Sequence, residues 1–459
     1  MRGHRDHDSF SIYLIRPIFA AMLRRRAAQR PLSGRARSLL LRALMLFLLA
    51  SLQLTAHATD GQSGQAAPPT PASFSWLNPT TWPVVPVPNL AVDPTSGATL
   101  GLIPTWLQHD SDGAIVRIIA PDIVHSTNFG WGAHFRILDF PSADTHWSIV
   151  AGAFQRVESN FDARYETGLL RERPWSLTAE AVYDRSGTAR FYGIGNETPH
   201  SAQSVYIRQQ MWFNVTLGWN ITHAWQLGYT VLARKVKAIG GHLPGIPSIT
   251  VRFPNVLGLG TTHEMLQRLS LTYDTRNNLT LPTQGVDIVV YAGIARRNGP
   301  FGRPMFTEAG GDGRFYWSPD RSLTIAAHID VHYLPSVRRI PFWALSSVGG
   351  EHSIVGERQT LRGFGNYRFY GRDSFSANIE VRRRVLSLDT LGTRIDLQIA
   401  PFFDVGRVFS RNSAFPIDKL HKAVGLGFRG IAAPFVVGYV DVGYGSEGAA
   451  VFTGINYPF

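Results

Sequence analysis

The residues whose types and spacing could do chemistry are an arginine in a glycine-rich segment and two carboxylates that follow it. Arg362 is followed directly by Gly363 and Phe364, and Glu380 and Asp404 come later in the chain. The planar guanidinium fits a carboxylate with two parallel hydrogen bonds, and a carboxylate removed from water needs such a partner. The glycine allows the tight backbone path that a folded-back loop requires. This chemistry fastens parts of a fold together, so we expect no catalytic residue among these groups.

Motifs for other chemistries are weak or missing. Residues 425–430 fit GxGxxG, but no βαβ pattern surrounds them and their flanks alternate as strands. His328 and His332, four positions apart, would be separated by about 13 Å on a strand and could not share a metal ion. The chain has no cysteine, and we find no GxSxG, HExxH or P-loop. We therefore expect no enzyme activity, no metal site and no cofactor.

The elements that must position the arginine and the carboxylates are β-strands. Apolar and polar residues alternate with a period of two from Asn89 to Phe459, most clearly in residues 285–296, 321–334 and 394–408. Segments of about ten residues with alternating faces and aromatic-rich ends are typical of an outer-membrane barrel. We expect an all-β fold, a transmembrane antiparallel β-barrel of about 16 strands. Fourteen and eighteen strands remain alternatives.

The alternation also predicts where the carboxylates point. Glu380 shares the polar face of its strand with Asn378 and Arg382, and Asp404 lies on the polar face of the next strand. Both carboxylates would then point into the lumen from neighbouring strands, and Arg362 is the candidate partner. In the alternative, Arg362 lies exposed at a loop tip, where an ion pair contributes less than about 1 kcal/mol.

Composition and charge limit the function classes. Of the formal net charge of +12, +8 lies in residues 1–58, which hold ten Arg and two Asp. The remaining +4, spread over the rest of the chain, gives no polycationic surface, so we expect no nucleic-acid partner. Basic clusters such as residues 382–384 are expected at the barrel rims, beside anionic lipid headgroups.

The start of the chain has the pattern of a targeting segment. Basic residues precede a short apolar stretch that begins at Ala43 and leads to the small-residue site Ala56-His57-Ala58. This pattern predicts a signal peptide over residues 1–58, cleaved after Ala58. Residues 59–88 are rich in Pro, Gly, Ser and Thr and are expected to form a periplasmic linker.

The last residues predict a terminal strand. Ile455, Tyr457 and Phe459 share one face of an alternating segment. We expect this aromatic strand to close the barrel by pairing with a first strand near residues 97–108, and it could also present the barrel to its assembly machinery. The alternative is that it is simply the last strand.

Four stretches carry motifs of a known protein family. The first is QTLRGFGNYRFYGRDSFSANIEVRRRV at 359–385, and the second is APFFDVGRVF at 400–409, which contains Phe402, Asp404 and Gly406 in the spacing F-x-D-x-G. The others are YDTRNNLTLPTQG at 273–285 and RFYGIGNETP at 190–199. Together they resemble the bacterial surface antigen family of outer-membrane barrels, the BamA and TamA assembly factors and their relatives.

The resemblance implies a location and a mechanism. The loop tip would lie inside the lumen with Arg362 against the strand acids, and a lateral seam between the first and last strands would open to insert or translocate proteins. The partners would be outer-membrane lipids, the barrel assembly machinery and client proteins. The assembly factors carry POTRA domains where we expect only a linker. A passive solute channel and a structural or adhesive surface barrel therefore remain alternatives.

Overall fold

The structure is a computed structural model. It describes residues 84–93, 97–111, 115–337, 339–350, 361–390, 393–410, 419–432 and 435–454, together with Tyr457 and Phe459. The expected signal peptide, most of the expected linker and Ile455 lie outside the described residues. The first strand begins at Val85, four residues before the expected start of the barrel at Asn89.

The first half of the chain folds into long strands that pair with their neighbours. They are β1 (Val85–Asp93), β2 (Gly97–His109), β3 (Ile115–Ile119), β4 (Asp122–Ser126), β5 (Gly130–Ser142), β6 (Thr145–Phe154), β7 (Ser159–Thr167), β8 (Trp175–Phe191), β9 (Ser204–Asn220) and β10 (Trp225–Gly240). Two short helices, η3 (His200–Ala202) and α3 (Ile249–Arg252), lie in the connections after β8 and β10.

The second half continues the same pattern with one long interruption. Its strands are β11 (Gly260–Asp274), β12 (Gly285–Arg297), β13 (Pro304–Asp320), β14 (Leu323–Val337), β17 (Asp373–Thr390), β18 (Thr393–Phe409), β19 (His421–Ala432), β20 (Phe435–Gly445) and β21 (Gly448–Gly454). Between β14 and β17 lie η4 (Phe342–Ala344) and a separate two-stranded sheet of β15 (Ser346–Val348) and β16 (Phe369–Gly371).

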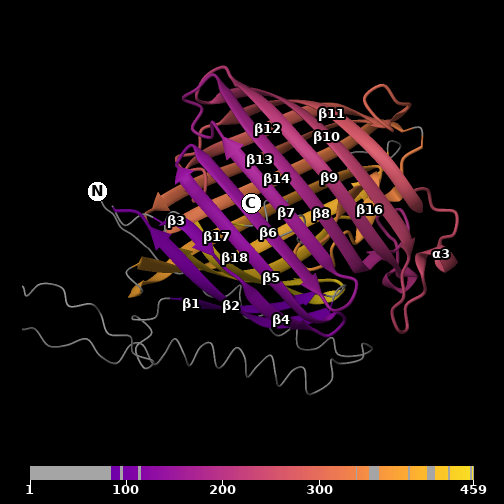
Figure 1. Ribbon diagram of the computed structural model, residues 1–459, viewed down its shortest axis with the longest axis horizontal. Coiled ribbons are helices and arrows are strands. Elements are labelled where there is room, and N and C mark those ends of the chain that lie inside the picture. The colour runs from indigo at the N-terminus through magenta and orange to yellow at the C-terminus, as the bar shows by residue number, and fades with distance from the viewer. Residues whose placement is uncertain are drawn as a thin grey trace, which may run out of the picture. The chain divides into compact units, whose positions relative to one another are not determined.

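The large sheet closes on itself, as expected for a barrel. Successive strands pair antiparallel and lie side by side around the barrel (Figure 1). Strand β1 pairs with both β2 and β21. Among the described residues, no helix combines the length and the apolar character needed to cross a membrane.

The strand number differs from the 16 expected. Over the described ranges the sheet has 19 strands, of which β3 and β4 are two parts of one, because both pair with β2 and with β5. The break falls at Ala120 and Pro121, where proline has no N–H to donate to a ladder. Counting the two parts as one gives 18. Eighteen was one of the two alternatives to 16, and short connections such as residues 143–144 and 321–322 leave room for the additional strands.

The two faces of the sheet separate as the alternation predicted. On β14, Ile329 is 52% exposed, whereas its neighbour His328 is fully buried. On β17 and β18, Ile379 and Phe403 point outward, whereas Glu380 is buried. The outer surface is therefore apolar and suited to lipid, and the charged residues face the lumen.

The interruption between β14 and β17 forms a loop that packs against the barrel wall. Leu361, Phe364 and Phe369 of this loop are buried in one cluster with Val408 of β18 and Ala423 of β19. We call residues 361–371 the lumenal loop. Its apolar contacts fix its backbone, so that Arg362 is held against the inner face of β18.

A candidate lumenal lock

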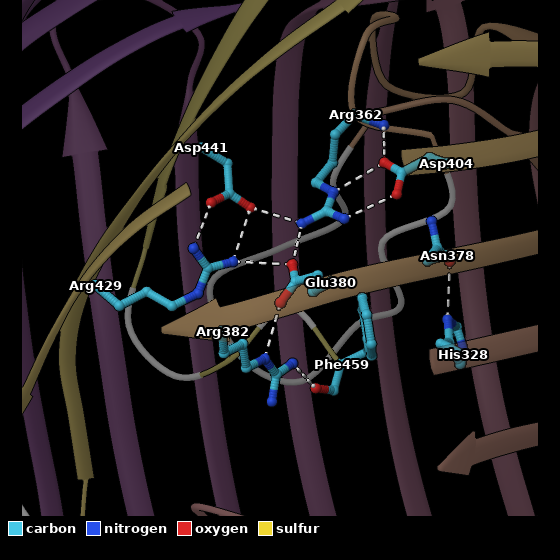
Figure 2. Close-up of polar contacts among 9 residues, drawn as sticks. All are labelled: His328, Arg362, Asn378, Glu380, Arg382, Asp404, Arg429, Asp441 and Phe459. Atoms are coloured by element: carbon cyan, nitrogen blue, oxygen red, sulfur yellow. Dashed lines mark hydrogen bonds and ion pairs between the residues drawn. The ribbon is translucent and has the colours of Figure 1, made fainter. Parts of the chain in front are cut away.

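Arg362 makes its most complete contact with Asp404. Its Nε donates to Oδ2 at 2.9 Å and its Nη2 donates to Oδ1 at 2.8 Å (Figure 2). The backbone N–H of Arg362 also donates to Oδ2, at 3.0 Å. One carboxylate thus fixes both the side chain and the backbone of the loop tip. The alternative of an exposed loop arginine is wrong, because Arg362 is fully buried.

Two more carboxylates complete the contacts of this guanidinium. Arg362 Nη1 donates to Glu380 Oε1 and, at 2.9 Å, to Asp441 Oδ2. Arg429 joins the same two acids, with Nη2 at 2.9 Å from Glu380 Oε1 and Nη1 at 2.9 Å from Asp441 Oδ1. Arg382 donates from Nε to Glu380 Oε2 at 2.9 Å.

These six side chains form a charge-balanced cluster, which we call the lock. Three arginines face three carboxylates, and no side chain among the six is more than 1% exposed. Buried charges of this kind persist only when each is paired and hydrogen-bonded, since moving a single ion out of water costs several kcal/mol. The members are Arg362, Arg382, Arg429, Glu380, Asp404 and Asp441.

The sequence identified half of the lock and missed the rest. Arg362, Glu380 and Asp404 come together as expected. The sequence patterns did not identify Asp441 and Arg429. Asp441 could have been identified, because it is the one acidic residue in the largely apolar strand β20. Arg382 lies in the lumen beside Glu380, as the alternation predicted, so its second assignment, to a basic cluster at the rim, is wrong. Its neighbour Arg383 has a 53% exposed side chain.

The other residues expected at the lock have distinct positions. The ring of Phe402 lies 3.6 Å from the guanidinium carbon of Arg362, in cation–π geometry. Phe364 packs edge-on against Phe369 at 5.6 Å between ring centroids. Gly363 and Gly406 add no side chain to the lock. Gly406 lies opposite Ser376 and His421 in the neighbouring strands and not against Arg362.

Glycines of β19 and β20 make room for the lumenal loop. A Cβ on Gly443 would lie 1.3 Å from the carbonyl oxygen of Arg362, and one on Gly425 would lie 2.2 Å from the ring of Phe402. A Cβ on Gly427 would meet Arg429 at 1.9 Å. Gly425 and Gly427 of the GxGxxG match therefore allow close packing in the lumen.

Tyr457 and Phe459, the two described residues that follow β21, lie outside the sheet. Strand β21 ends at Gly454, and Phe459 lies in the lumen, where its ring stacks on His328 at 5.2 Å and its carbonyl oxygen accepts a hydrogen bond from Arg382 Nη2 at 3.0 Å (Figure 2). Tyr457 donates its hydroxyl to Gln398 at 3.0 Å. The polar lumen offers these aromatic residues hydrogen bonds and a guanidinium face, which the lipid side does not.

The closing partner also differs from the expected one. The strand that pairs with β21 is β1, through Val92 and Val451, whereas residues 97–109 form the second strand. Strands β1 and β2 pair antiparallel over nine residue pairs, and the proline-rich composition of residues 82–88 had concealed the first of them.

A second anchor joins the lumenal loop to two other segments. Arg368 donates from Nε to both carboxylate oxygens of Glu447, at 2.8 and 2.9 Å, and from Nη2 to the carbonyl oxygen of Thr198 at 2.7 Å. In the same region the N–H of Gly195 donates to the carbonyl oxygen of Tyr370 at 2.7 Å. The loop is thus fixed both to the β20–β21 turn and to the connection that follows β8.

The fold and the site define a class of protein: a closed outer-membrane β-barrel whose lumen holds a folded-in loop fastened by buried ion pairs. Over the described residues, no group of three or more His, Asp or Glu is placed to hold a metal ion. The chain belongs to the Omp85 superfamily, whose domain model matches residues 149–437. The resemblance to the BamA and TamA family is thereby confirmed, and with it the outer-membrane location.

Solved structures show likenesses at low sequence identity. BamA from Haemophilus ducreyi lacking POTRA domains 1–3 is 12% identical with a TM-score of 0.46, over 81% of this chain and 75% of that one. CdiB from Escherichia coli is 13% identical with a TM-score of 0.43, over 82% of this chain and 62% of that one. No curated protein sequence matches the chain.

Proposed function

We propose that this barrel inserts or translocates other proteins at the outer membrane through a lateral seam between β1 and β21. The observation that carries this proposal is the short closing ladder. Among the described residues, β1 and β21 share one pair, Val92 opposite Val451, whereas β1 and β2 share nine and β20 and β21 share seven. A seam with so few ladder hydrogen bonds costs the least to open.

Opening the seam would expose the edge of β1. An unpaired strand edge presents a row of N–H and C=O groups that an incoming strand can pair with. Client proteins with β-strands are therefore the partners that this edge suits. Lipids contact the outer face, and the barrel assembly machinery would serve the insertion of the chain itself.

The lock is connected to the seam through the β20–β21 hairpin, which lies beside the seam and is held by the lock. Arg362 and Arg429 bind Asp441 on β20, and Arg368 binds Glu447 in the turn before β21. Arg382 binds the carbonyl oxygen of Phe459, beyond the end of β21. In this proposal the lumenal loop keeps the β20–β21 hairpin in place while the β1 side of the seam separates.

The same contacts favour this function over a passive channel. A steady pore needs a continuous lumen, but the lumenal loop is joined to the connection after β8, at Gly195 and Thr198. The buried cluster of Phe191, Tyr206, Phe342 and Tyr370 adds further cover at that end. As part of the same proposal, we infer that the protein is not an enzyme.

A disulfide across the seam tests the function directly, since the chain has no cysteine of its own. Val92→Cys and Val451→Cys are introduced together, the barrel is refolded, and the pair is oxidised afterwards. The assay is the rate at which other outer-membrane barrels fold into liposomes that contain the protein. We expect acceleration by the wild type, its loss on oxidation of the variant, and its return on reduction.

The matched control is a second pair within a long ladder. Leu232 and Leu266 lie opposite each other on β10 and β11, so their cysteine variants can be cross-linked without touching the seam. This control should keep full activity when oxidised. Full activity of the oxidised seam variant, or no acceleration by the wild type, would overturn the proposal.

A further inference from the structure

A second region of the lumen has the composition of a binding site. A cavity of about 410 Å³ lies between β5, β6, β7, β8 and the connection of residues 275–284. None of the six residues of the lock lines this cavity. Its volume falls in the range of pockets that hold small ligands, about 300–1,000 Å³. Five arginines line it: Arg136, Arg164, Arg171, Arg276 and Arg314.

The charges that face this cavity are mainly positive. The lining carboxylates are Glu166 and Asp274, against the five arginines. Asp274 is already used by Arg276, whose Nη2 donates to it at 2.7 Å. Asp122 binds Arg136 at 2.7 Å but is not part of the lining. An anion placed in the cavity would therefore meet five guanidinium groups and two carboxylates, one of which is already bound by Arg276.

Two of the arginines have donors to spare. Within the described part of the chain, the Nε atoms of Arg164 and Arg314 are buried and have no hydrogen-bond partner. Three carboxylates form loose ion pairs with these arginines: Glu166 lies 3.4 Å from Arg164 Nη2, and Asp287 lies 3.7 Å from Arg314 Nη1. A third, Asp312, lies 3.2 Å from Arg314 Nε, without the alignment of a hydrogen bond. These two Nε–H groups can donate to a ligand oxygen without giving up a hydrogen bond within the protein.

Aromatic side chains form the rest of the wall. Phe140, Trp147 and Tyr316 line the cavity together with Tyr457 and Phe459 from the end of the chain. Rings of this kind bind the apolar or aromatic body of a ligand whose anionic end is held by arginine.

A neighbouring cavity shares part of the lining of the first. A second cavity, of about 710 Å³, shares Phe140, His146, Arg171 and Arg276 with the first and extends past Asn277 and His223. The two cavities therefore adjoin, beside the connection of residues 275–284.

We propose that this cavity binds an anionic group, a carboxylate or a phosphate, carried on an aromatic or apolar body. Arg164 and Arg314 are the specific donors, and the aromatic residues hold the body of the ligand. This site is independent of the seam, and its occupancy does not require protein insertion.

Binding is measured by titration calorimetry on the full chain refolded in detergent micelles. The probes are N-acetyl-L-phenylalanine, its uncharged amide, and phenyl phosphate. We expect both anions to bind and the amide to bind at least tenfold more weakly. The affinities of the two anions show whether the carboxylate or the phosphate fits the site better. Equal affinity for the acid and the amide, or no binding of either anion, would overturn the proposal without any variant being needed.

A double variant then assigns the donors. Arg164→Gln with Arg314→Gln should weaken anion binding at least tenfold and leave the amide unaffected, while the matched control Arg303→Gln removes an exposed arginine outside the lining. Heat-modifiable mobility on gels checks that each variant is folded. If the double variant does not fold, Arg164→Gln alone is used, with a smaller loss expected. Unchanged affinity in a folded variant would contradict the assignment.

Discussion

Arg362 and Asp404 form a bidentate ion pair in which the loop backbone takes part, because the N–H of Arg362 donates to the same carboxylate at 3.0 Å. Both residues are fully buried. The pair joins the lumenal loop to β18, and through Glu380 and Asp441 the same guanidinium reaches β17 and β20. One side chain therefore fastens three strands of the wall, and its removal should have consequences beyond the loop.

Arg362→Ala should destabilise the barrel strongly. It leaves three buried carboxylates with two arginines, and removing one partner of a buried ion pair costs about 3–5 kcal/mol. The measurement is unfolding in urea together with heat-modifiable mobility on gels. Arg303→Ala, at an exposed arginine, is the control and should change little. Wild-type stability of Arg362→Ala would mean that the lock does not hold the fold together.

Gly443→Ala should displace the loop without changing any charge. The added Cβ would lie 1.3 Å from the carbonyl oxygen of Arg362, so the loop or β20 must move. Overpacking of this kind costs about 1–3 kcal/mol. Gly313→Ala on β13 is a matched control, because nothing lies within 4 Å of its Cβ position. Equal stabilities of the two variants would contradict the close approach.

Deletion of residues 359–368 should open the lumen. The wild-type barrel is expected to be nearly closed in planar-bilayer recordings, because the lumenal loop occupies the lumen and joins the connection after β8. The deletion removes both Arg362 and Arg368 and should produce a large, steady conductance. If the wild type conducts freely and the deletion changes nothing, the passive channel becomes the better function.

Glu158 should make stability depend on pH. It lies in the turn before β7, where burial raises the pKa of its carboxyl from 4.5 to about 7, assisted by Asp184 and opposed by the hydrogen bond from the Gly187 N–H. Because the folded state holds the proton more tightly, this carboxyl lowers stability as pH rises from about 4.5 to about 7.

Glu158→Gln should remove that part of the pH dependence. Between pH 4.5 and pH 7, the free energy of unfolding of the wild type should fall by about 2 kcal/mol more than that of the variant, after allowance for the partial exposure of Glu158. Urea midpoints at pH 5 and pH 8 measure it. Parallel pH profiles for the two proteins would show that Glu158 titrates normally.

The sequence predicted the wall of this barrel better than its interior. Alternation with a period of two is a local property, imposed on each strand by having lipid on one side and the lumen on the other. It therefore identified the exposed face of Ile329 and Ile379 and the buried face of Glu380. The lengths of turns such as residues 143–144 are not encoded in that alternation, and the strand number was underestimated.

By itself, the sequence determined the fold class, the orientation of each strand face, and the pairing of Arg362 with Glu380 and Asp404. Only the tertiary structure decided which distant residues share the lumen: Asp441 and Arg429 in the lock, and Phe459 beside Arg382 instead of in the sheet. These contacts depend on the closure of the sheet and on the register of strands far apart in the chain. A local pattern specifies which way a side chain points, but not which side chain it meets across a closed barrel.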